Sequence, residues 1–468
     1  MSDKVFIGLG LVQAISLFIS VTFICYVLTI VVPYLRHRPA ATGNSGDYQW
    51  HFVVPARDEA AVIGHTVQTL RGRFPQAHVW VVDDASLDAT PQIVARHANA
   101  DGHVHLVRRC LPDARTGKGD ALNSAYDALN RHLDDVEREV GRYVDVDVDR
   151  SKLIVGVLDA DGVPADNCLD VISAAHLFGR GDVGAVQICV RMVNRDDRLP
   201  FASRGRIANF LGQLLVRMQD LEFRAPISAI QMVRQRTRTV GLGGNGQFAR
   251  LSALDAVAGH DDRPWHGSLL EDYELSLHLL MAGYQNEYTM DTLVDQEGLP
   301  SMRRLLTQRT RWGQGTMQCG SYLPRIWASR NVSTLGALEA SYYLIQPWLQ
   351  LLGTVLYPVP VAVLAYNVHA YPSEMAYFVT HGGWMLAVLY LVLGLSPFVM
   401  WGPLYARRCE PSIGAGRALG LGLAYSLFIA TFYITCWRAL FRILGGRRGW
   451  AKTRRNTDLQ PGPVALEA

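Results

Sequence analysis

Four long runs without Asp, Glu, Lys or Arg limit how this 468-residue chain can fold. The first is Val5 to Leu35, and three more near the other end are Ala340 to Ser373, Met375 to Ala406 and Ala418 to Trp437. A helix needs about 20 apolar residues to cross a bilayer, and the first run is too long for a signal-peptide core. The runs predict a retained membrane anchor, then a soluble domain, then transmembrane helices.

Basic residues beside these runs predict the orientation. Arg36 and Arg38 follow the first run, so the positive-inside rule places the next segment in the cytoplasm. Three later spans would leave the tail outside, whereas its many Arg and Lys residues indicate inside. Either one run is re-entrant or interfacial, or one long Pro-containing run folds as two pieces. We expect an anchor over 1–36, a cytoplasmic domain over 37–335, a transmembrane bundle over 336–442 and a basic cytoplasmic tail over 443–468, in a multi-pass protein of a bacterial inner membrane.

Composition excludes two classes of site. The net charge of +3 gives no basic footprint for nucleic acid. The seven cysteines are scattered without a C-x-x-C pair, which fits a reducing compartment and argues against a cysteine-built metal site.

Short apolar runs alternate with helical periodicity across the central domain. This alternation predicts an α/β fold with a largely parallel sheet covered by helices on both faces. We expect the acidic segment Asp134 to Asp149 to be an exposed insertion, and Leu199 to Phe223 and Leu305 to Trp327 to be amphipathic interface helices. The expected strands are 51–55, 79–82, 104–107, 153–158 and 183–190, and the expected helices are 59–70, 87–97 and 119–133.

Two carboxylates, Asp159 and Asp161, come directly after one buried strand. Open α/β sheets bind ligands at the carboxyl ends of their strands. Carboxylates with one residue between them can share a hard cation such as Mg²⁺ or Mn²⁺. A single D-x-D is also typical of a solvated turn, so its neighbours decide the interpretation.

Other strand ends also carry polar residues. Asp58 and Glu59 follow the first strand, Asp84 follows the second, and Lys118 stands at a helix start. A carboxylate can accept hydrogen bonds from a ribose or base, and a lysine there can meet a diphosphate. Singly, each could be a helix cap or turn residue. Together they predict a nucleotide-diphosphate site.

Two later segments complete the candidate site. Glu271 and Asp272 open a predicted helix, where they could be dipole partners or supply a general base. The glycine-rich loop before them offers Gly244, Asn245 and Gly246 for close approach to an acceptor.

The segment Gln308 to Trp312 has the sequence QRTRW. Arg309 and Arg311 could grip a diphosphate and Trp312 could stack on a sugar ring. The alternative is a basic face on lipid headgroups, which explains Gln308 and Trp312 poorly.

The order of these motifs resembles a known family. Asp84, Asp159-Ala160-Asp161, Glu271-Asp272 and the QRTRW segment resemble the D, DxD, (T)ED, Q(Q/R)xRW series of membrane-embedded family 2 glycosyltransferases, which include cellulose, hyaluronan and chitin synthases. Val186-Gln187, with Arg191 and Asn194, is similar to the VQxR..N segment of the glucan and mannan branch. The resemblance implies a GT-A type domain with a Rossmann-like mixed sheet.

The resemblance also implies a role for each residue. Asp272, beside Glu271, would take a proton from the acceptor, and Asp161 with Asp159 would hold Mg²⁺ or Mn²⁺ and the diphosphate. Trp312 and the loop residues Gly244, Asn245 and Gly246 would contact the acceptor. The nucleotide and its diphosphate would be bound by Asp58, Glu59, Asp84, Lys118, Asp159, Gln308, Arg309 and Arg311.

The expected activity is inverting transfer from a nucleotide sugar, with UDP-glucose favoured, to a growing β-linked polysaccharide that is exported across the membrane. The alternative is a non-processive enzyme that adds a single sugar to a lipid acceptor. From another class, the chain could be a transporter or receptor with a nucleotide-sensing domain, but the charge-free runs offer little for ion-coupled transport. Trp450 to Thr453 vaguely resembles the gating loop of synthases, which agrees with a cytoplasmic tail.

Overall fold

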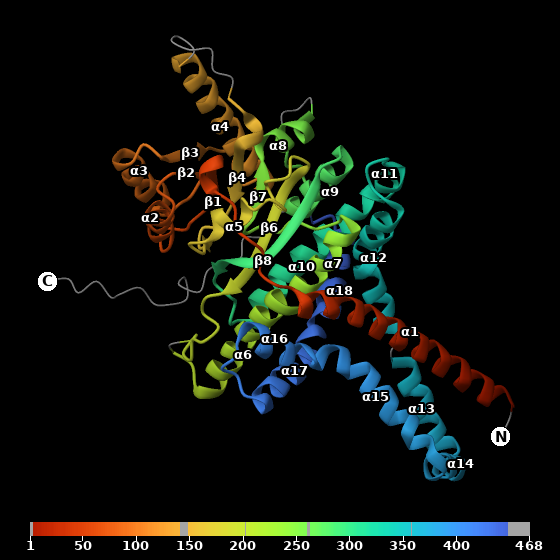
Figure 1. The fold of residues 1–468 in the computed structure, drawn as a ribbon. Helices are drawn as coiled ribbons and strands as arrows, with labels where there is room; N and C mark the ends of the chain where they lie inside the picture. Colours follow the sequence, from red (N-terminus) through yellow and green to blue (C-terminus); the bar gives the residue numbers. More distant parts are fainter. Residues whose placement is uncertain (1–2, 141–147, 202, 260–262, 357, 448–468) are drawn as a thin grey trace.

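An eight-stranded mixed sheet forms the centre of the molecule (Figure 1). The computed structural model describes residues 3–140, 148–201, 203–259, 263–356 and 358–447. The order across the sheet is β3-β2-β1-β4-β7-β6-β8-β5. The strands are β1 Gln49–Ala56, β2 His78–Asp84, β3 Val104–Arg109, β4 Leu153–Val157, β5 Val163–Pro164, β6 Val183–Met192, β7 Gln247–Arg250 and β8 Gln285–Gln296.

Strands β3, β2, β1 and β4 are mutually parallel, so their carboxyl ends meet at one edge of the sheet. Beyond them, β7 runs antiparallel to both β4 and β6, which gives the mixed sheet expected for a GT-A domain. The five expected strands are confirmed. Strands β5, β7 and β8 were not predicted. β5 has only two residues, β7 directly continues the glycine-rich loop, and β8 carries polar residues such as Glu287, Asp291 and Asp295 among its apolar ones.

Helices cover both faces of the sheet, as expected. Residues of α2 (Ile63–Arg73), α3 (Thr90–Ala100) and α5 (Cys168–Ile172) pack on one face with Phe52 and Val81. Residues of α4 (Lys118–Val140), α8 (Leu251–Ala258) and α9 (Glu271–Ala282) pack on the other with Val53 and Trp80. This two-faced burial is the physical basis of the α/β layering.

Helix α4 is longer than the sequence indicated. It continues to Val140, so the first part of the expected insertion, Asp134 to Asp149, is helical. Acidic and basic residues hide the helical period there, since few apolar residues mark a buried face. Residues 141–147 of that segment lie outside the described residues.

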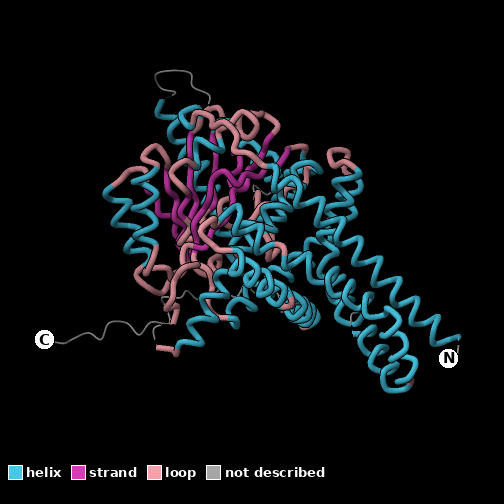
Figure 2. The backbone as a smooth tube through the Cα atoms, turned by 60° about the horizontal axis from the view of Figure 1, so that its bottom comes forward, coloured by secondary structure: helices cyan, strands magenta, loops and turns pink. Residues whose placement is uncertain are grey.

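The remaining helices form the other half of the molecule, and α1, α13 and α15 lie side by side as an arm that extends away from the sheet (Figures 1 and 2). Their bounds are α1 Asp3–Arg36, α6 Arg206–Glu222, α7 Ser228–Thr237, α10 Met302–Cys319, α11 Leu323–Ala328, α12 Thr334–Leu356, α13 Pro358–Ala370, α14 Pro372–Phe378, α15 Trp384–Val399, α16 Trp401–Cys409, α17 Ala415–Ile429 and α18 Thr431–Leu444. Short 3₁₀ or π turns are Ser45–Asp47, Arg150–Lys152, Phe223–Ile227, Gly320–Tyr322 and Val379–Gly383.

Within the described residues, two helical segments are long and apolar enough to cross a membrane: Thr334–Ala370 and Ala415–Leu444. A shorter apolar stretch is Ser20–Arg36. The expected span Met375 to Ala406 is not one helix, because His381 and Gly382 have non-helical backbone and α15 has only 16 residues. The four-span, multi-pass organisation is therefore not supported. Most of the expected tail, including the gating-loop segment, lies outside the described residues.

A buried ionic cluster joins the sheet domain to the carboxyl-terminal helices. Arg224, in the π turn after α6, lies 3.1 Å from Asp220 and 2.6 Å from Glu410, which follows α16. The Tyr405 hydroxyl donates to the Asp220 carboxylate at 2.5 Å, and that carboxylate also accepts from the Met192 backbone N–H of β6. Buried charges need partners of this kind, because an unpaired one costs several kcal/mol.

Two glycines allow α16 and α17 to pack closely. A Cβ at Gly402 would overlap the Ala418 carbonyl, and a Cβ at Gly422 would overlap the Val399 carbonyl at the end of α15. Gly420 lies on the same helix as Gly422, yet a Cβ there would meet nothing within 4 Å.

We therefore expect Gly422→Ala to destabilise the protein by about 1–3 kcal/mol, because the added methyl has no room. Gly420→Ala is the matched control and should be neutral or stabilising by up to about 1 kcal/mol, since alanine favours helix. Thermal unfolding of the detergent-solubilised protein measures both. Equal effects of the two substitutions would contradict the close packing.

Candidate active site

The carboxyl ends of β1 and β2 are tied together by their loops. The Asp58 backbone N–H donates to Ser86 Oγ at 2.9 Å, and the Leu87 N–H donates to Asp58 Oδ1 at 2.7 Å. Asp58 and Ala85 both have left-handed backbone, with φ of 52° and 55°. Such conformations are costly for residues other than glycine and cluster at functional sites. Glu59 lies in the same loop and is buried.

Asp84 ends β2 and is buried in an ion pair. Arg109 Nη1 lies 2.5 Å from Asp84 Oδ1, and the Arg115 backbone N–H donates to the same oxygen at 2.8 Å. Asp84 thus positions the loop that leads into α4. Neither arginine was singled out from the sequence, because nothing in their spacing distinguishes them from surface arginines.

Lys118 contacts residues from two other segments of the site. Its Nζ donates to Asp159 Oδ1 at 2.7 Å and to the Gly244 carbonyl at 2.6 Å. Burial lowers the pKa of Lys118, but the carboxylates of Asp159, Glu271 and Asp272 outweigh burial, so the pKa is raised. One ammonium group at the start of α4 therefore links the end of β4, the glycine-rich loop and the start of α9.

Of the three loop residues expected to contact an acceptor, only Gly244 faces these carboxylates. A Cβ at Gly244 would lie 3.0 Å from Lys118 Nζ and 3.2 Å from Asp272 Oδ2. Asn245 is buried, and its side chain accepts from the Asp159 backbone N–H at 3.2 Å and donates to Gln296 at 2.9 Å. A Cβ at Gly246 would meet Val294 at 2.6 Å. Asn245 and Gly246 thus support the site from behind rather than line it.

The VQxR..N residues also have a supporting role in this structure. Gln187 accepts from the Gly243 N–H at 2.8 Å and donates to the Asn245 carbonyl at 3.0 Å, which holds the glycine-rich loop. Arg191 pairs with Asp295 at 2.6 Å, and Asn194 donates to the Gly298 carbonyl at 2.9 Å. These contacts brace β6 against β8 and the chain that follows it. Gln296 was missed by the sequence analysis together with β8.

Glu271 and Asp272 form the first turn of α9, as expected, and both are buried. Burial and the neighbouring Glu271 raise the pKa of Asp272 to about 7, although Lys118 opposes the shift. Burial also raises the pKa of Glu271, against the positive charges of Lys118 and Arg311. A carboxylate whose pKa lies near neutrality can both accept and hold a proton at physiological pH.

The QRTRW segment lies on α10, and its two arginines face different surroundings. The positive charge of Arg311 opposes the rise in the pKa of Glu271, which agrees with its expected place beside the site. Arg309 is buried against Glu222 with an Nη2 to Oε2 distance of 2.5 Å, and its guanidinium stacks on Trp312 at 4.3 Å. The Trp312 ring also contacts Phe223 edge-on. Gln308 is half-buried on the same helix. For Arg309, a structural ion pair replaces the expected diphosphate contact.

Asp159 and Asp161 present carboxylate oxygens just past β4, a donor set that suits Mg²⁺ or Mn²⁺. Asp161 Oδ2 accepts from the Glu297 backbone N–H at 2.9 Å, which fixes its position. The Asp159 side chain is 42% exposed at the sheet edge, although one oxygen meets Lys118. These two residues therefore fit the expected cation site.

The mixed sheet, with acidic residues at the carboxyl edge of its parallel half and a buried acidic pair beside them, defines a glycosyltransferase domain of GT-A type. A family model described as "Glycosyltransferase like family 2" matches residues 49–315. The chain belongs to this family.

Curated relatives are named for a lipid product. A beta-monoglucosyldiacylglycerol synthase of Trichormus variabilis is 29% identical over 320 residues, covering 67% of this chain and 58% of that protein. The synthase of the same name from Synechocystis is 31% identical over 290 residues, covering 60% of this chain and 51% of that protein. The chain thus spans between half and three fifths of the length of these relatives.

A solved structure with the same fold is a mannosyltransferase from Pyrobaculum calidifontis, in complex with GDP-Man and Mn²⁺. Its TM-score is 0.52 at 17% identity, and the match covers 93% of this chain and 99% of that one. This likeness confirms the GT-A fold.

These comparisons correct one expectation. The relatives with monoglucosyldiacylglycerol synthase names favour the alternative, a single-sugar lipid transferase, over the processive polysaccharide synthase. The membrane-embedded character of the resemblance is not confirmed by them.

The buried pair of Glu222 and Arg309 yields a test of its structural role. We expect Glu222→Ala to cost about 3–5 kcal/mol of stability, because it leaves a buried guanidinium unpaired. The paired change Glu222→Leu with Arg309→Met should recover much of the loss. The control Asp135→Ala breaks an exposed ion pair with Arg138 and should cost less than about 1 kcal/mol. Thermal unfolding distinguishes them, and a Glu222→Ala protein as stable as the control would contradict this role.

Proposed function

We propose that this protein is an inverting glycosyltransferase that moves one glucose from UDP-glucose to the hydroxyl group of a diacylglycerol-type lipid. The names of its relatives support the donor sugar and the acceptor class. The resemblance of the motif series to family 2 enzymes supports the inverting course. The site residues keep the roles expected from that resemblance, apart from Arg309, Asn245 and Gly246, which support the site from outside it.

The observation that carries the proposal is the buried pair Glu271 and Asp272 beside Lys118. Asp272 lies at the start of α9, facing the gap that the small Gly244 leaves open. Its pKa of about 7 leaves a large fraction ionised at neutral pH yet makes it basic enough to accept a proton. A general base for an acceptor hydroxyl needs both properties.

The reaction is a single displacement. The acceptor oxygen attacks C1 of glucose while Asp272 takes the hydroxyl proton, and the bond from C1 to the diphosphate oxygen breaks with its electron pair leaving on UDP. Attack opposite the leaving group converts an α-linked donor into a β-linked product. Arg311 and Lys118 offer positive charge to the departing diphosphate. Mg²⁺ or Mn²⁺ held by Asp159 and Asp161 would supply further charge neutralisation there.

The surroundings of α9 favour a lipid acceptor. Tyr273, next to Asp272, packs on Tyr343 of α12 with ring centroids 4.6 Å apart. The outer surface of α12 exposes an apolar stripe that includes Leu338, Ile345 and Leu352. A helix with this stripe can lie against lipid while its opposite face, with Tyr343, packs on α9 beside Asp272. A soluble glycan would gain nothing from this stripe.

Product analysis tests the proposal. Detergent-solubilised protein, mixed micelles of dioleoylglycerol, Mg²⁺ or Mn²⁺ and radiolabelled UDP-glucose should give label in a chloroform-extractable, β-glucosidase-sensitive lipid. Asp272→Asn should abolish it, and a chelator should lower the rate to background, because the diphosphate then lacks its counter-charge. UDP-GlcNAc and GDP-mannose serve as control donors. Label in high-molecular-weight material would instead establish a polysaccharide synthase.

The pKa of Asp272 predicts the pH dependence of the rate. Only the ionised carboxylate can take a proton, so kcat/KM should fall about tenfold per pH unit below pH 7. Glu271→Gln removes the negative charge that raises this pKa, so the acidic limb should move to lower pH. A limb that stays in place or moves upward in that variant would contradict the assignment of Asp272 as base.

A further inference from the structure

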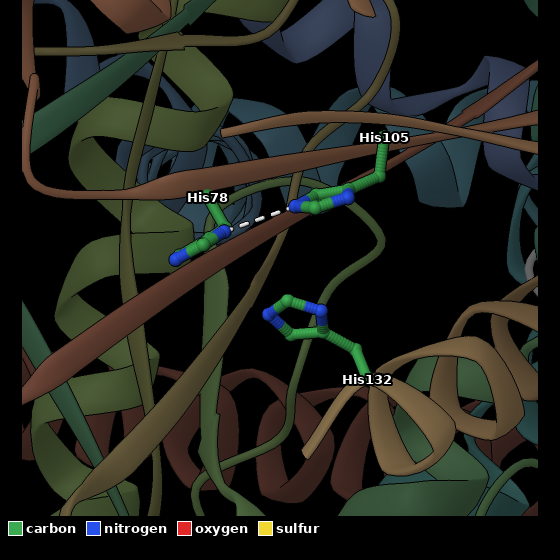
Figure 3. A group of neighbouring side chains, drawn as sticks. All are labelled: His78, His105 and His132. Atoms are coloured by element: carbon green, nitrogen blue, oxygen red, sulfur yellow. Dashed lines mark hydrogen bonds between the residues drawn. The ribbon is translucent and has the colours of Figure 1, made fainter. Parts of the chain in front are cut away.

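A row of histidines crosses the sheet at the end opposite the active site. His51 of β1 pairs in register with His78 of β2, and Trp80 of β2 pairs with His105 of β3. Because alternate residues of a strand point to the same face, the three histidines share the face that α4 covers. His132 of α4 completes the group (Figure 3). His78 begins β2 and Asp84 ends it, about 20 Å away at 3.3 Å per residue.

Three of these side chains present nitrogen atoms to one another. His78 Nδ1 and His105 Nε2 are 2.9 Å apart, and His78, His105 and His132 each offer a nitrogen within 4.8 Å of the others. Figure 3 shows the His132 ring turned toward the other two. Nitrogens bound at about 2.0–2.1 Å around a tetrahedral Zn²⁺ lie about 3.3 Å apart. To bind one ion together with His78 and His105, the ligand nitrogen of His132 would have to move toward theirs by no more than about 1.5 Å.

The surroundings of the cluster hold its rings in place. The ring of His105 stacks on Trp80 with centroids 3.9 Å apart. A ring held in a fixed orientation needs little ordering before it binds a cation.

His51 provides a second, independent observation. It is 2% exposed, its ring stacks on His78 at 5.1 Å, and Trp80 Nε1 donates to its Nδ1 at 3.2 Å. Its Nε2 has no hydrogen-bond partner among the described residues. An unsatisfied buried polar atom costs about 1–3 kcal/mol. An apolar side chain at this position would avoid that cost, so packing alone does not explain why histidines lie next to one another here.

We propose that His78, His105 and His132 bind a transition-metal ion that prefers imidazole ligands, with Zn²⁺ the best match to three nitrogens and an open fourth position. The ion would fasten α4 to β2 and β3. Since Lys118 is the first residue of α4, the same helix carries the central cation of the active site at its start and the ligand His132 about four turns later. This site is separate from the carboxylates Asp159 and Asp161.

Co²⁺ binding tests the proposal, because a four-coordinate Co²⁺ site gives intense visible absorption bands. The full-length, tag-free protein in detergent is stripped with a chelator and titrated with Co²⁺ in excess Mg²⁺, which occupies oxygen ligands but not imidazoles. We expect one equivalent of Co²⁺ with these bands, displaced by Zn²⁺. His132→Ala should weaken binding by more than the 10- to 100-fold loss typical of outer-shell changes.

His65→Ala is the matched control, because His65 is exposed on α2 outside the cluster, and it should bind Co²⁺ like the native protein. Zn²⁺ should raise the unfolding midpoint of the native and control proteins but not of His132→Ala. His132 is half-buried, and an unchanged metal-free midpoint shows that this variant folds; His105→Gln provides a second variant that keeps a polar side chain. Absence of saturable Co²⁺ binding in the native protein, or binding in both cluster variants as tight as in the native protein, would overturn the proposal.

Discussion

The contact of the Lys118 ammonium group with Asp159 and the Gly244 carbonyl is the interaction on which the site depends. Asp159, Glu271 and Asp272 bring three carboxylates close together, two of them buried, and the positive charge of Lys118, with that of Arg311 near Glu271, offsets their repulsion. The surrounding residues are correspondingly small. A Cβ at Gly119, next to Lys118, would lie 2.9 Å from the His266 carbonyl, so glycine there lets α4 start against the chain that precedes α9.

Much of the fold could be predicted because buried parallel strands are continuous apolar runs. Leu153 to Val157 is one such run, and it forms β4 with every residue buried. The site was predictable for the same reason, since the carboxyl ends of parallel strands must meet at one edge. Strand β8 was not predicted because it is only partly buried and contains acidic residues. Glu287 pairs with Arg180, and Asp295 pairs with Arg191. Such pairing is visible only once the chain has folded.

The sequence could not distinguish Arg309 from Arg311. Residues two apart on a helix point about 200° away from each other, so both cannot face one ligand. The structure pairs Arg309 with Glu222, and no local pattern identifies Glu222 as the partner, because it lies 87 residues earlier in the chain. The similarity of the VQxR..N segment to the glucan and mannan branch likewise did not indicate what its residues contact. Gln187 holds the glycine-rich loop, and Arg191 and Asn194 hold β8 and the chain after it, so in this protein the motif residues have a structural role.

The ionic cluster of Asp220, Arg224 and Glu410 has a consequence for how such a protein can be divided or recombined. Arg224 belongs to the segment that follows the sheet's β6 strand, whereas Glu410 and Tyr405 come from the carboxyl-terminal helices. A fragment cut before α12 would keep Arg224 and Asp220 but lose the partners that neutralise and cover them. The sheet domain is therefore not a module that can be exchanged between helical scaffolds, because part of its interior is supplied by the helices it would leave behind.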